Sequence, residues 1–357
     1  MQLDEYRTLG RSGLRVSPLT LGTMAFGNPG WGSDSETSAQ LIEAFLEAGG
    51  NMIDTANGYI EGESERIVGD YLAKRPGLRD RVVVSTKFAR NMYPGDPNGG
   101  GSSRKSVIEQ VDASLQRLQL DYIDLYWQHC WDQHTPIEET VSTLNDLVHA
   151  GKVRYLGVSN TPAWAVMRAA GVAEGEGWAT FIAYQPEYSL LRRTCEGEIF
   201  GAVRALGLGV TPYSPLASGV LSGKYTRDDQ SPEGSGRGPL AASQLRENPN
   251  AFEVLDALEQ IAKEQDTNVA AVALAWVRQR KEVVSTLIGV RTLDQLHANL
   301  ASLAVDIPEE WMATLDELTK PDLNYPFPWL ATIADNNQQN GATVNGVRTQ
   351  TYVRATD

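Results

Sequence analysis

The segment Val82-Val83-Val84-Ser85-Thr86-Lys87 is a short β-branched run that ends on a cation. Runs of this length and composition are typical of buried strands in a parallel sheet. Similar apolar runs recur along the chain, and together they predict eight strands, at residues 19–23, 51–54, 82–87, 122–128, 153–158, 181–185, 209–213 and 285–288.

Stretches with helical periodicity separate these strands, and several of them begin at Ser or Pro, residues that are common at helix N-termini. Examples are residues 35–48, 103–118, 137–149 and 162–170. Strands that alternate with helices predict an α/β fold with a parallel sheet, and eight such units predict a (β/α)8 TIM barrel.

Three segments fall outside the eight units. Residues 6–16 carry a Ser12-Gly13 turn, which predicts an N-terminal β-hairpin that plugs the barrel bottom. Residues 214–250 are rich in Gly, Ser and Pro, and we expect a long irregular loop there. We expect a single barrel domain over residues 1–320 and an extended C-terminal tail over residues 321–357, aromatic at 325–329 and polar from 335.

The composition argues against several classes of partner. The 357 residues carry a formal net charge of -14, which repels nucleic acids and anionic membranes. The first seven residues are polar with no apolar run behind them, so we expect no signal peptide, no membrane span and a cytoplasmic location. The expected partner is a small carbonyl compound, and the chain is expected to be a monomer or a homo-oligomer.

The two cysteines, Cys130 and Cys195, are far apart in the sequence. Their spacing supports neither a disulfide framework nor a zinc site. We therefore expect two ordinary buried thiols and no bound metal.

Polar side chains mark the ends of three predicted strands. In a (β/α)8 barrel the active site lies at the C-terminal ends of the strands. There the sequence has Asp54, Lys87 and His129, and Tyr59 lies in the loop after Asp54. We expect these four titratable groups to converge at the mouth of the barrel.

This set of residues suits the reduction of a carbonyl group. Hydride addition leaves an alkoxide that must receive a proton, and a tyrosine with its ordinary pKa of about 10 donates that proton reluctantly. A lysine beside the phenol lowers its pKa, an aspartate keeps the lysine charged, and an imidazole hydrogen-bonds the substrate oxygen. Asp54 and Lys87 alone would equally fit a structural ion pair, but Tyr59 and His129 beside them favour catalysis.

The same residues lie in motifs that resemble those of the aldo-keto reductase family, over about residues 6–318. The resemblance implies NADPH-dependent reduction of aldehydes or ketones, with Tyr59 as proton donor, Lys87 and Asp54 tuning it, and His129 positioning the carbonyl. The motifs are Ile53-Asp54-Thr55-Ala56-x-x-Tyr59, Ser85-Thr86-Lys87, Asp124-Leu125-Tyr126-x-x-His129, Leu21-Gly22-Thr23-Met24, Gly157-Val158-Ser159-Asn160, Tyr213-Ser214-Pro215-Leu216 and Gly289-x-Arg291.

The resemblance also implies a set of NADPH contacts. Residues 214–224 are similar to the pyrophosphate loop of the long-chain branch, which includes bacterial oxidoreductases and potassium-channel β-subunits. Of the implied contacts, three bind the carboxamide (Ser159, Asn160, Gln185), one stacks on the nicotinamide (Tyr213), one binds the 2′-phosphate (Arg291) and two reach the adenine (Gln295, Asn299). The others are Gly22, Thr23, Met24, Asp54, Ser214, Leu216, Ser218, Gly219, Lys224 and Gly289.

Independent of that resemblance, the sequence argues against a Rossmann fold. Gly207-Leu208-Gly209 begins the Gly-x-Gly-x-x-Gly fingerprint but does not complete it. A barrel instead binds phosphate at the loops after its last two strands, where Gly289, Arg291 and Thr292 stand. The planar guanidinium of Arg291 suits phosphate, and its contact with the 2′-phosphate, which the resemblance implies, indicates a preference for NADPH over NADH.

The substrate and two other functions stay open at this stage. Trp31, Phe88, Trp127, Trp131 and Trp329 suggest a roomy aromatic pocket, although Trp127 would equally fit the interior and Trp329 the outer surface. Aromatic aldehydes, keto sugars and polycyclic ketones all fit such a pocket. The alternatives are an NADPH-binding regulatory or sensor protein with negligible turnover, and an unrelated barrel enzyme such as an isomerase with Lys87 as its base.

Overall fold

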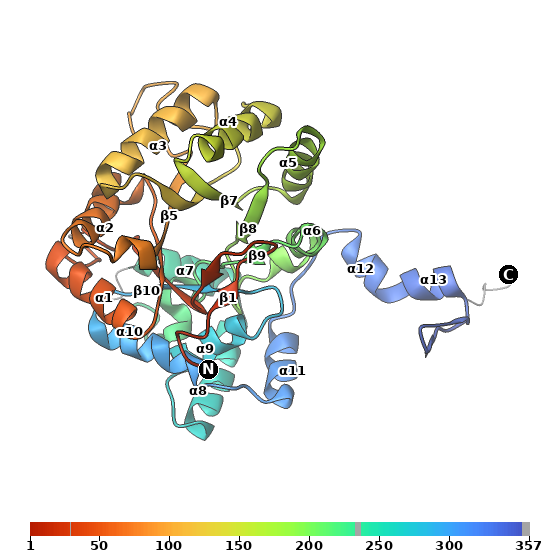
Figure 1. Cartoon of the computed structure of the whole chain (residues 1–357). Helices are drawn as coiled ribbons and strands as arrows, with labels where there is room; N and C mark the ends of the chain where they lie inside the picture. The colour runs from red at the N-terminus through yellow and green to blue at the C-terminus, as the bar shows by residue number, and fades with distance from the viewer. Residues whose placement is uncertain (29, 233–236, 352–357) are drawn as a thin grey trace. The chain divides into compact units, whose positions relative to one another are not determined.

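The computed structural model describes residues 1–28, 30–232 and 237–351. The chain divides into two compact units, Met1–Thr319 and Lys320–Asp357. The last residues of the expected tail, 352–357, lie outside the described residues. In Figure 1 the helices of the first unit surround its sheet.

Within the described residues, the first unit is built on an eight-stranded sheet in which neighbouring strands pair in parallel. The sheet closes on itself because Val284 N donates to Val210 O at 2.9 Å and Leu287 N donates to Pro212 O at 3.0 Å. The predicted (β/α)8 barrel is confirmed. The strands, in spatial order, are β10 (Thr286–Gly289), β3 (Leu19–Gly22), β4 (Met52–Asp54), β5 (Val83–Phe88), β6 (Ile123–Gln128), β7 (Val153–Ser159), β8 (Phe181–Gln185) and β9 (Gly209–Val210).

Helices follow the strands along the chain. Of the helices described, none combines the length and the apolar character that a membrane span requires. The α-helices of the first unit are α1 (Ser35–Glu47), α2 (Glu63–Ala73), α3 (Arg104–Leu118), α4 (Ile137–His149), α5 (Ala163–Glu176), α6 (Glu198–Leu206), α7 (Gly238–Glu247), α8 (Ala251–Glu264), α9 (Val269–Arg278), α10 (Leu293–Leu300) and α11 (Glu309–Leu318). Short 3-10 turns are η1 (Tyr59–Gly62), η2 (Arg79–Arg81), η3 (Thr194–Glu196), η4 (Ala217–Ser222) and η5 (Ala301–Leu303).

The ends of these helices follow from the local sequence. The side chains of Asp34, Ser103 and Thr292 accept hydrogen bonds from backbone N–H groups in the first turns of α1, α3 and α10. Gly177 and Gly207 end α5 and α6 with φ angles of 68° and 66°, a left-handed conformation that glycine adopts without strain.

The second unit is described separately. It contains α12 (Phe327–Trp329), a π-helical turn η6 (Leu330–Ala334), α13 (Asp335–Gln339) and a short antiparallel pair of strands, β11 (Thr343–Val344) and β12 (Val347–Arg348).

The core has two layers. Adjacent strand residues alternate between them: Met52 and Val83 pack inside the barrel, whereas Ile53 and Val84 pack between the sheet and the helices. Trp127 is the largest side chain of the interior cluster and is fully buried.

The N-terminal hairpin covers one end of the barrel interior. Its strands β1 (Arg7–Thr8) and β2 (Arg15–Val16) pair antiparallel. Leu9 and Val16 are fully buried in the same interior cluster as Met52 and Trp127. The hairpin therefore seals the end of the barrel where the strands begin, as the sequence predicted.

Three predicted segments differ from the structure. The strand expected at 209–213 is regular only over β9, because Pro212 has no N–H to continue the ladder. The helix expected at 162–170 continues to Glu176, since the next left-handed glycine is Gly177. The loop expected at 214–250 is helical in part, because it contains α7.

Packing around Trp127 generates a prediction about stability. A methyl group added at Gly157 would overlap the Trp127 indole, which has no room to move inside the barrel. We expect Gly157→Ala to lower the free energy of unfolding by about 1–3 kcal/mol, the usual cost of overpacking a core. Chemical denaturation monitored by circular dichroism measures this change.

The matched control for this substitution is Gly171→Ala. Gly171 lies within α5, and a methyl group added there meets open space. That variant should be neutral or more stable by about 0.5–1 kcal/mol, because alanine favours helix. Equal stability of the two variants would show that the interior tolerates a larger residue beside Trp127.

Candidate active site

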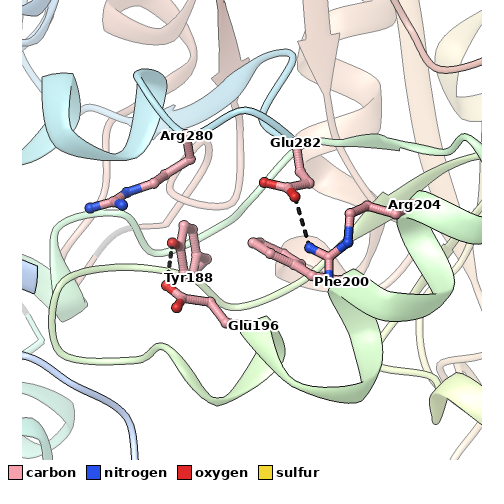
Figure 2. Close-up of a pocket in the computed structure, with 6 residues that line it drawn as sticks. All are labelled: Tyr188, Glu196, Phe200, Arg204, Arg280 and Glu282. Atoms are coloured by element: carbon pink, nitrogen blue, oxygen red, sulfur yellow. Dashed lines mark hydrogen bonds and ion pairs between the residues drawn. The ribbon is translucent and has the colours of Figure 1, made fainter. Parts of the chain in front are cut away.

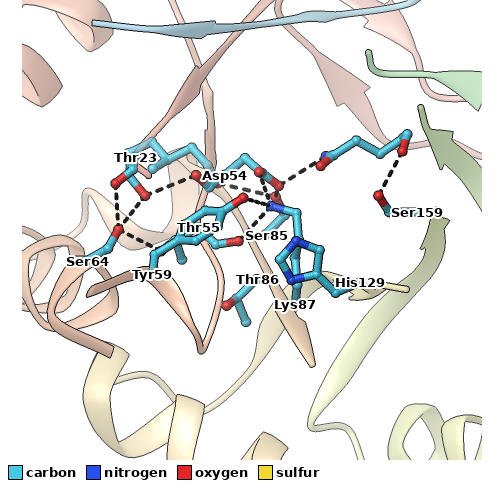
Figure 3. A network of polar contacts seen from close by, with 12 residues as sticks. Thr23, Asp54, Thr55, Tyr59, Ser64, Ser85, Thr86, Lys87, His129 and Ser159 are labelled. Atoms are coloured by element: carbon cyan, nitrogen blue, oxygen red, sulfur yellow. Dashed lines mark hydrogen bonds and ion pairs between the residues drawn. The ribbon is translucent and has the colours of Figure 1, made fainter. Parts of the chain in front are cut away.

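Four polar residues meet at the ends of adjacent strands (Figure 3). Asp54 ends β4, Lys87 lies near the end of β5, and His129 follows β6, while Tyr59 begins η1. Asp54 and Lys87 are fully buried, and Tyr59 and His129 are partly exposed. The site therefore has a dry, charged base beneath two rings that reach the surface.

Lys87 is the centre of the hydrogen-bond network. Its ammonium forms an ion pair with the Asp54 carboxylate, and it donates to Thr55 O at 2.9 Å and to Tyr59 OH at 3.1 Å. An ammonium has three N–H donors, so these three acceptors fix its position. Because the Tyr59 oxygen accepts from Lys87, its own hydrogen remains available for another acceptor.

The second carboxylate oxygen of Asp54, Oδ1, also accepts hydrogen bonds. Ser85 Oγ donates to Asp54 Oδ1 at 2.6 Å, and Gln185 Nε2 approaches the same oxygen at 3.4 Å. These bonds satisfy a buried carboxylate that would otherwise be costly to keep in the barrel.

His129 lies beside the phenol of Tyr59. The two ring centroids are 5.9 Å apart, and the ring planes are nearly perpendicular at 82°. An acceptor atom near the Tyr59 hydroxyl would therefore lie within reach of the imidazole edge.

Burial and charge set the protonation states of the three groups. Burial raises the pKa of the Tyr59 phenol, and the opposing effect of the Lys87 ammonium does not cancel this rise. Burial acts to lower the pKa of Lys87, but Asp54 and Tyr59 outweigh it, and the pKa lies above its ordinary value. Burial, helped by Lys87 and Arg90, lowers the pKa of His129 to about 3.

At neutral pH the site thus presents a protonated phenol, a charged ammonium and a neutral imidazole. The net direction for Tyr59 is opposite to the one expected from the sequence. The desolvation of the phenol, which a sequence does not reveal, exceeds the effect of Lys87.

Sequence reasoning missed the residues that hold the Tyr59 turn. Ile60 and Glu61 have left-handed φ angles of 47° and 53°. Directly after the turn, Ser64 Oγ bonds the hydroxyls of Thr23 at 2.7 Å and Thr55 at 2.9 Å (Figure 3). The turn is therefore anchored to the ends of β3 and β4.

Glu65, also missed, anchors the same turn to β5 and α3. It is fully buried and accepts from Thr86 Oγ1 at 2.5 Å and from Arg117 Nε at 2.6 Å. A glutamate near a helix N-terminus is usually exposed, so the sequence held no signal for this burial.

The expected carboxamide-binding residues come together at the ends of β7 and β8. Ser159 Oγ donates to Gln185 O at 2.8 Å. Asn160, with a left-handed φ of 45°, donates to His129 O at 2.9 Å and accepts from Tyr213 OH at 2.8 Å. Asn160 thus joins the catalytic end of β6 to the loop after β9.

The segment after β9 has an unusual backbone. Ser214, Ala217, Ser218 and Gly219 all have left-handed φ angles, between 47° and 95°. Such conformations in non-glycine residues carry strain and concentrate at ligand-binding loops. This segment also contains the predicted contact Leu216, which is partly buried against the core.

Three cations lie near one another beside this segment. Burial and then the neighbouring Arg291 lower the pKa of Lys224, and burial with Arg291 also lowers the pKa of Arg237. The Arg237 guanidinium lies 4.9 Å from the centre of the Trp31 ring, and Arg291 Nη1 donates to Trp31 O at 3.4 Å. This set fits a ligand with several phosphate groups. Arg237 was missed, because a lone arginine in a Gly-rich segment gives no pattern.

The remaining predicted cofactor residues lie on neighbouring strand ends and on α10. The register pairs Gly22 with both Gly289 and Asp54, and Thr23 and Met24 follow Gly22. Gln295 accepts from Arg291 N at 2.9 Å, and Asn299 is buried on the same helix.

The structure separates the five aromatic residues expected to line the substrate pocket. Phe88 is fully buried between the sheet and the helices, with its ring centroid 4.9 Å from that of Tyr126, and Trp127 is fully buried inside the barrel. Both are packing residues here. Trp31 contacts the two arginines, and Trp131 is partly buried at the mouth. Trp329 belongs to the second unit, so its place in the pocket stays a prediction.

A separate cavity of about 200 Å³ holds none of the four central residues (Figure 2). Its charged side chains pair within the protein, since Arg204 binds Glu282 at 2.9 Å and Tyr188 donates to Glu196 at 2.6 Å.

Among the described residues, no cluster of three or more His, Cys, Asp or Glu side chains is arranged to hold a metal ion. Cys130 is exposed rather than buried as expected, because it follows His129 at the open end of the barrel.

Comparison with known proteins agrees with this geometry. The model of the Aldo/keto reductase family matches residues 18–320. The chain belongs to this family. It is 38% identical to norsolorinic acid reductase from Aspergillus flavus, over 92% of this chain and 84% of that protein. It is 34% identical to a putative aryl-alcohol dehydrogenase from Saccharomyces cerevisiae (91% and 89% covered) and 36% identical to an aryl-alcohol dehydrogenase from Pestalotiopsis microspora (92% and 85% covered).

The family and the names of these relatives support an oxidoreductase that acts on carbonyl groups. Aldo-keto reductases generally use nicotinamide cofactors, and the residues at the ends of β7, β8, β9 and β10 offer suitable donors for one.

The low pKa of His129 yields a prediction. The folded protein should keep this imidazole neutral between pH 5 and 8, because its pKa is about 3, whereas a free histidine titrates near 6.5. Nitrogen-15 NMR of the imidazoles, with the His129 signal assigned by its loss in His129→Gln, measures this. A signal that titrates near pH 6.5 would contradict the assignment of a neutral imidazole.

The lowered pKa of His129 also makes the free energy of unfolding depend on pH. Below about pH 6.5 the unfolded chain binds a proton at this histidine while the folded chain does not, so the free energy of unfolding falls as the pH decreases toward 3. His129→Gln should therefore lose less stability than the wild type between pH 7 and pH 5.

Proposed function

We propose that this protein is an NADPH-dependent reductase of aldehydes or ketones. The observation that carries the proposal is the contact of Lys87 Nζ with Tyr59 OH at 3.1 Å, above the buried Asp54. A structural ion pair needs no phenol beside it, and a barrel isomerase that used Lys87 as its base would need a neutral amine. The raised pKa of Lys87 argues against such a base.

When bound, NADPH would supply the hydride that reduces the carbonyl carbon of the substrate. Tyr59 gives its proton to the carbonyl oxygen as negative charge develops there. The ammonium of Lys87 stabilises the resulting phenolate, and the Asp54 carboxylate keeps that ammonium charged. The neutral imidazole of His129 orients the carbonyl oxygen by a hydrogen bond.

The cofactor would lie across the strand ends. Ser159, Asn160 and Gln185 offer hydrogen bonds for the carboxamide, and Tyr213 offers a ring for stacking. The cations Lys224 and Arg291 would bind the phosphates, and we propose that Arg291 binds the 2′-phosphate that distinguishes NADPH from NADH.

The substrate is proposed to be an aromatic carbonyl compound. The named relatives include reductases of norsolorinic acid and dehydrogenases of aryl alcohols. In this chain, Trp131 lies two residues beyond His129, so an aromatic residue closely follows the histidine that would orient the carbonyl oxygen. An NADPH sensor without turnover is disfavoured because Lys87 contacts both Asp54 and Tyr59, and the ring of His129 lies beside that of Tyr59.

Substitution of Tyr59 tests the proposed chemistry. Tyr59→Phe should lower kcat for benzaldehyde by at least about a hundredfold, because general acid catalysis contributes that much or more. The Kd for NADPH should hardly change, since the phenol does not anchor the cofactor. Steady-state rates from NADPH absorbance and a fluorescence titration measure the two quantities.

The control is Tyr93→Phe, because Tyr93 is 60% exposed and lies outside the site. It should keep full activity. If Tyr59→Phe retained wild-type turnover, Tyr59 would not be the proton donor.

Substitution of Arg291 tests the choice of cofactor. Arg291→Ala should raise the Kd for NADPH about ten- to a hundredfold, as expected for the loss of a hydrogen-bonded charge pair. The Kd for NADH should change much less, because NADH has no 2′-phosphate. Arg168→Ala, which removes a surface pair with Glu138, is the matched control. Equal losses for both cofactors would place Arg291 away from the 2′-phosphate.

A further inference from the structure

Two tryptophans from different elements meet beside the catalytic end of the barrel. Trp131 follows β6 two residues after His129, and Trp164 is the second residue of α5. Their ring centroids are 5.5 Å apart with the planes at 77°, an edge-to-face contact. We name Trp131 and Trp164 the tryptophan pair.

The exposure of Trp164 is not explained by the core, whereas Trp131 packs partly against it. Trp164 is 61% exposed, although α5 buries Ala165, Val166 and Ala169 on its inner side. An exposed indole leaves a large apolar surface in water, which is unfavourable by about 25 cal/mol for each Å². Ligand pockets are commonly lined by aromatic side chains, so an exposed indole at the end of the barrel that holds the proposed active site is a candidate ligand contact.

Hydrogen bonds fix the pair to the active site. Trp131 N donates to Asn160 O at 3.1 Å, and Asn160 in turn donates to His129 O at 2.9 Å. Only three residues separate Asn160 from Trp164. The Cα atoms of His129 and Trp131 are at most about 7 Å apart, because even a fully extended chain advances no more than about 3.6 Å per residue. The pair is therefore held at a set distance from the residue that would orient the carbonyl group.

We infer that Trp131 and Trp164 form a distal subsite for flat, fused-ring aromatic substrates whose carbonyl group lies at Tyr59 and His129. This inference rests on the proposed function and adds a substrate class to it. In the edge-to-face arrangement, the face of one indole is not covered by the other. A planar ring system that extends beyond the first ring can stack there.

We expect the ring system of a linear three-ring aldehyde to extend farther toward the pair than the ring of a single-ring aldehyde does. The subsite therefore predicts that the protein binds a three-ring aldehyde more tightly than a single-ring aldehyde, and that this difference depends on the tryptophan pair. Stacking of aromatic rings contributes about 0.5–1.5 kcal/mol beyond buried area, and about 1.4 kcal/mol corresponds to a tenfold change in binding.

The experiment compares benzaldehyde with anthracene-2-carbaldehyde. Trp164→Ala should raise the KM for the three-ring aldehyde five- to tenfold relative to its effect on benzaldehyde, and Trp164→Phe should restore most of the loss. Met167→Ala is the control, because Met167 is 42% exposed one turn later on α5 and has no part in the proposal. An equal change in KM for both aldehydes in Trp164→Ala would overturn the subsite.

A second measurement separates this inference from the proposed function. Absence of turnover of either aldehyde by the wild type would contradict the proposed function alone. The subsite is then tested by the equilibrium binding of anthracene-2-methanol, which should be five- to tenfold weaker in Trp164→Ala. Unchanged binding would overturn it. Sedimentation velocity adds another outcome: if Trp164→Ala changed only the oligomeric state, the pair would be a contact between two copies of the chain.

Discussion

The ion pair between Lys87 and Asp54 is the constraint on which the site depends. Both side chains are fully buried, and a buried charge without its partner would destabilise the fold by several kcal/mol. The register of the sheet makes the pair possible, because Asp54 lies opposite Ser85, two residues before Lys87. Residues two apart on a strand point to the same side, so Ser85 and Lys87 both face Asp54 inside the barrel. The proposed chemistry is built on this paired ammonium, whose remaining donors position Thr55 and Tyr59.

Much of this site could be predicted from the sequence, because a parallel barrel brings its strand ends together. A polar residue at the end of an apolar run therefore lies at the end of the barrel where the site is expected, as Asp54, Lys87 and His129 do. The alternation of a strand could also have excluded Phe88, since it follows Lys87 and so must face outward. Contacts that join distant segments could not be predicted. Glu65 and Arg117 are 52 residues apart, and nothing in the sequence around either one indicates the partner.

The three groups around the proposed carbonyl position have separate roles because their surroundings differ. Lys87 has a partner of opposite charge and stays protonated, whereas burial, helped by Lys87 and Arg90, lowers the pKa of His129 and keeps it neutral. Tyr59 lies between them with its proton retained. The arrangement provides one proton to donate and one fixed positive charge to receive the phenolate. A second acid does not compete for the substrate oxygen.

The barrel closes at its shortest strand, β9, which is interrupted by Pro212. The segments that follow β9 and β10 carry Lys224 and Arg291, so a dinucleotide held by both would span the seam between these two strands. A ligand that binds only the folded chain stabilises it in proportion to the logarithm of its concentration. Opening at the seam, and with it cleavage by proteases, would then depend on the concentration of the dinucleotide. Because the phosphates are the same in the reduced and the oxidised forms, both forms would protect the folded chain.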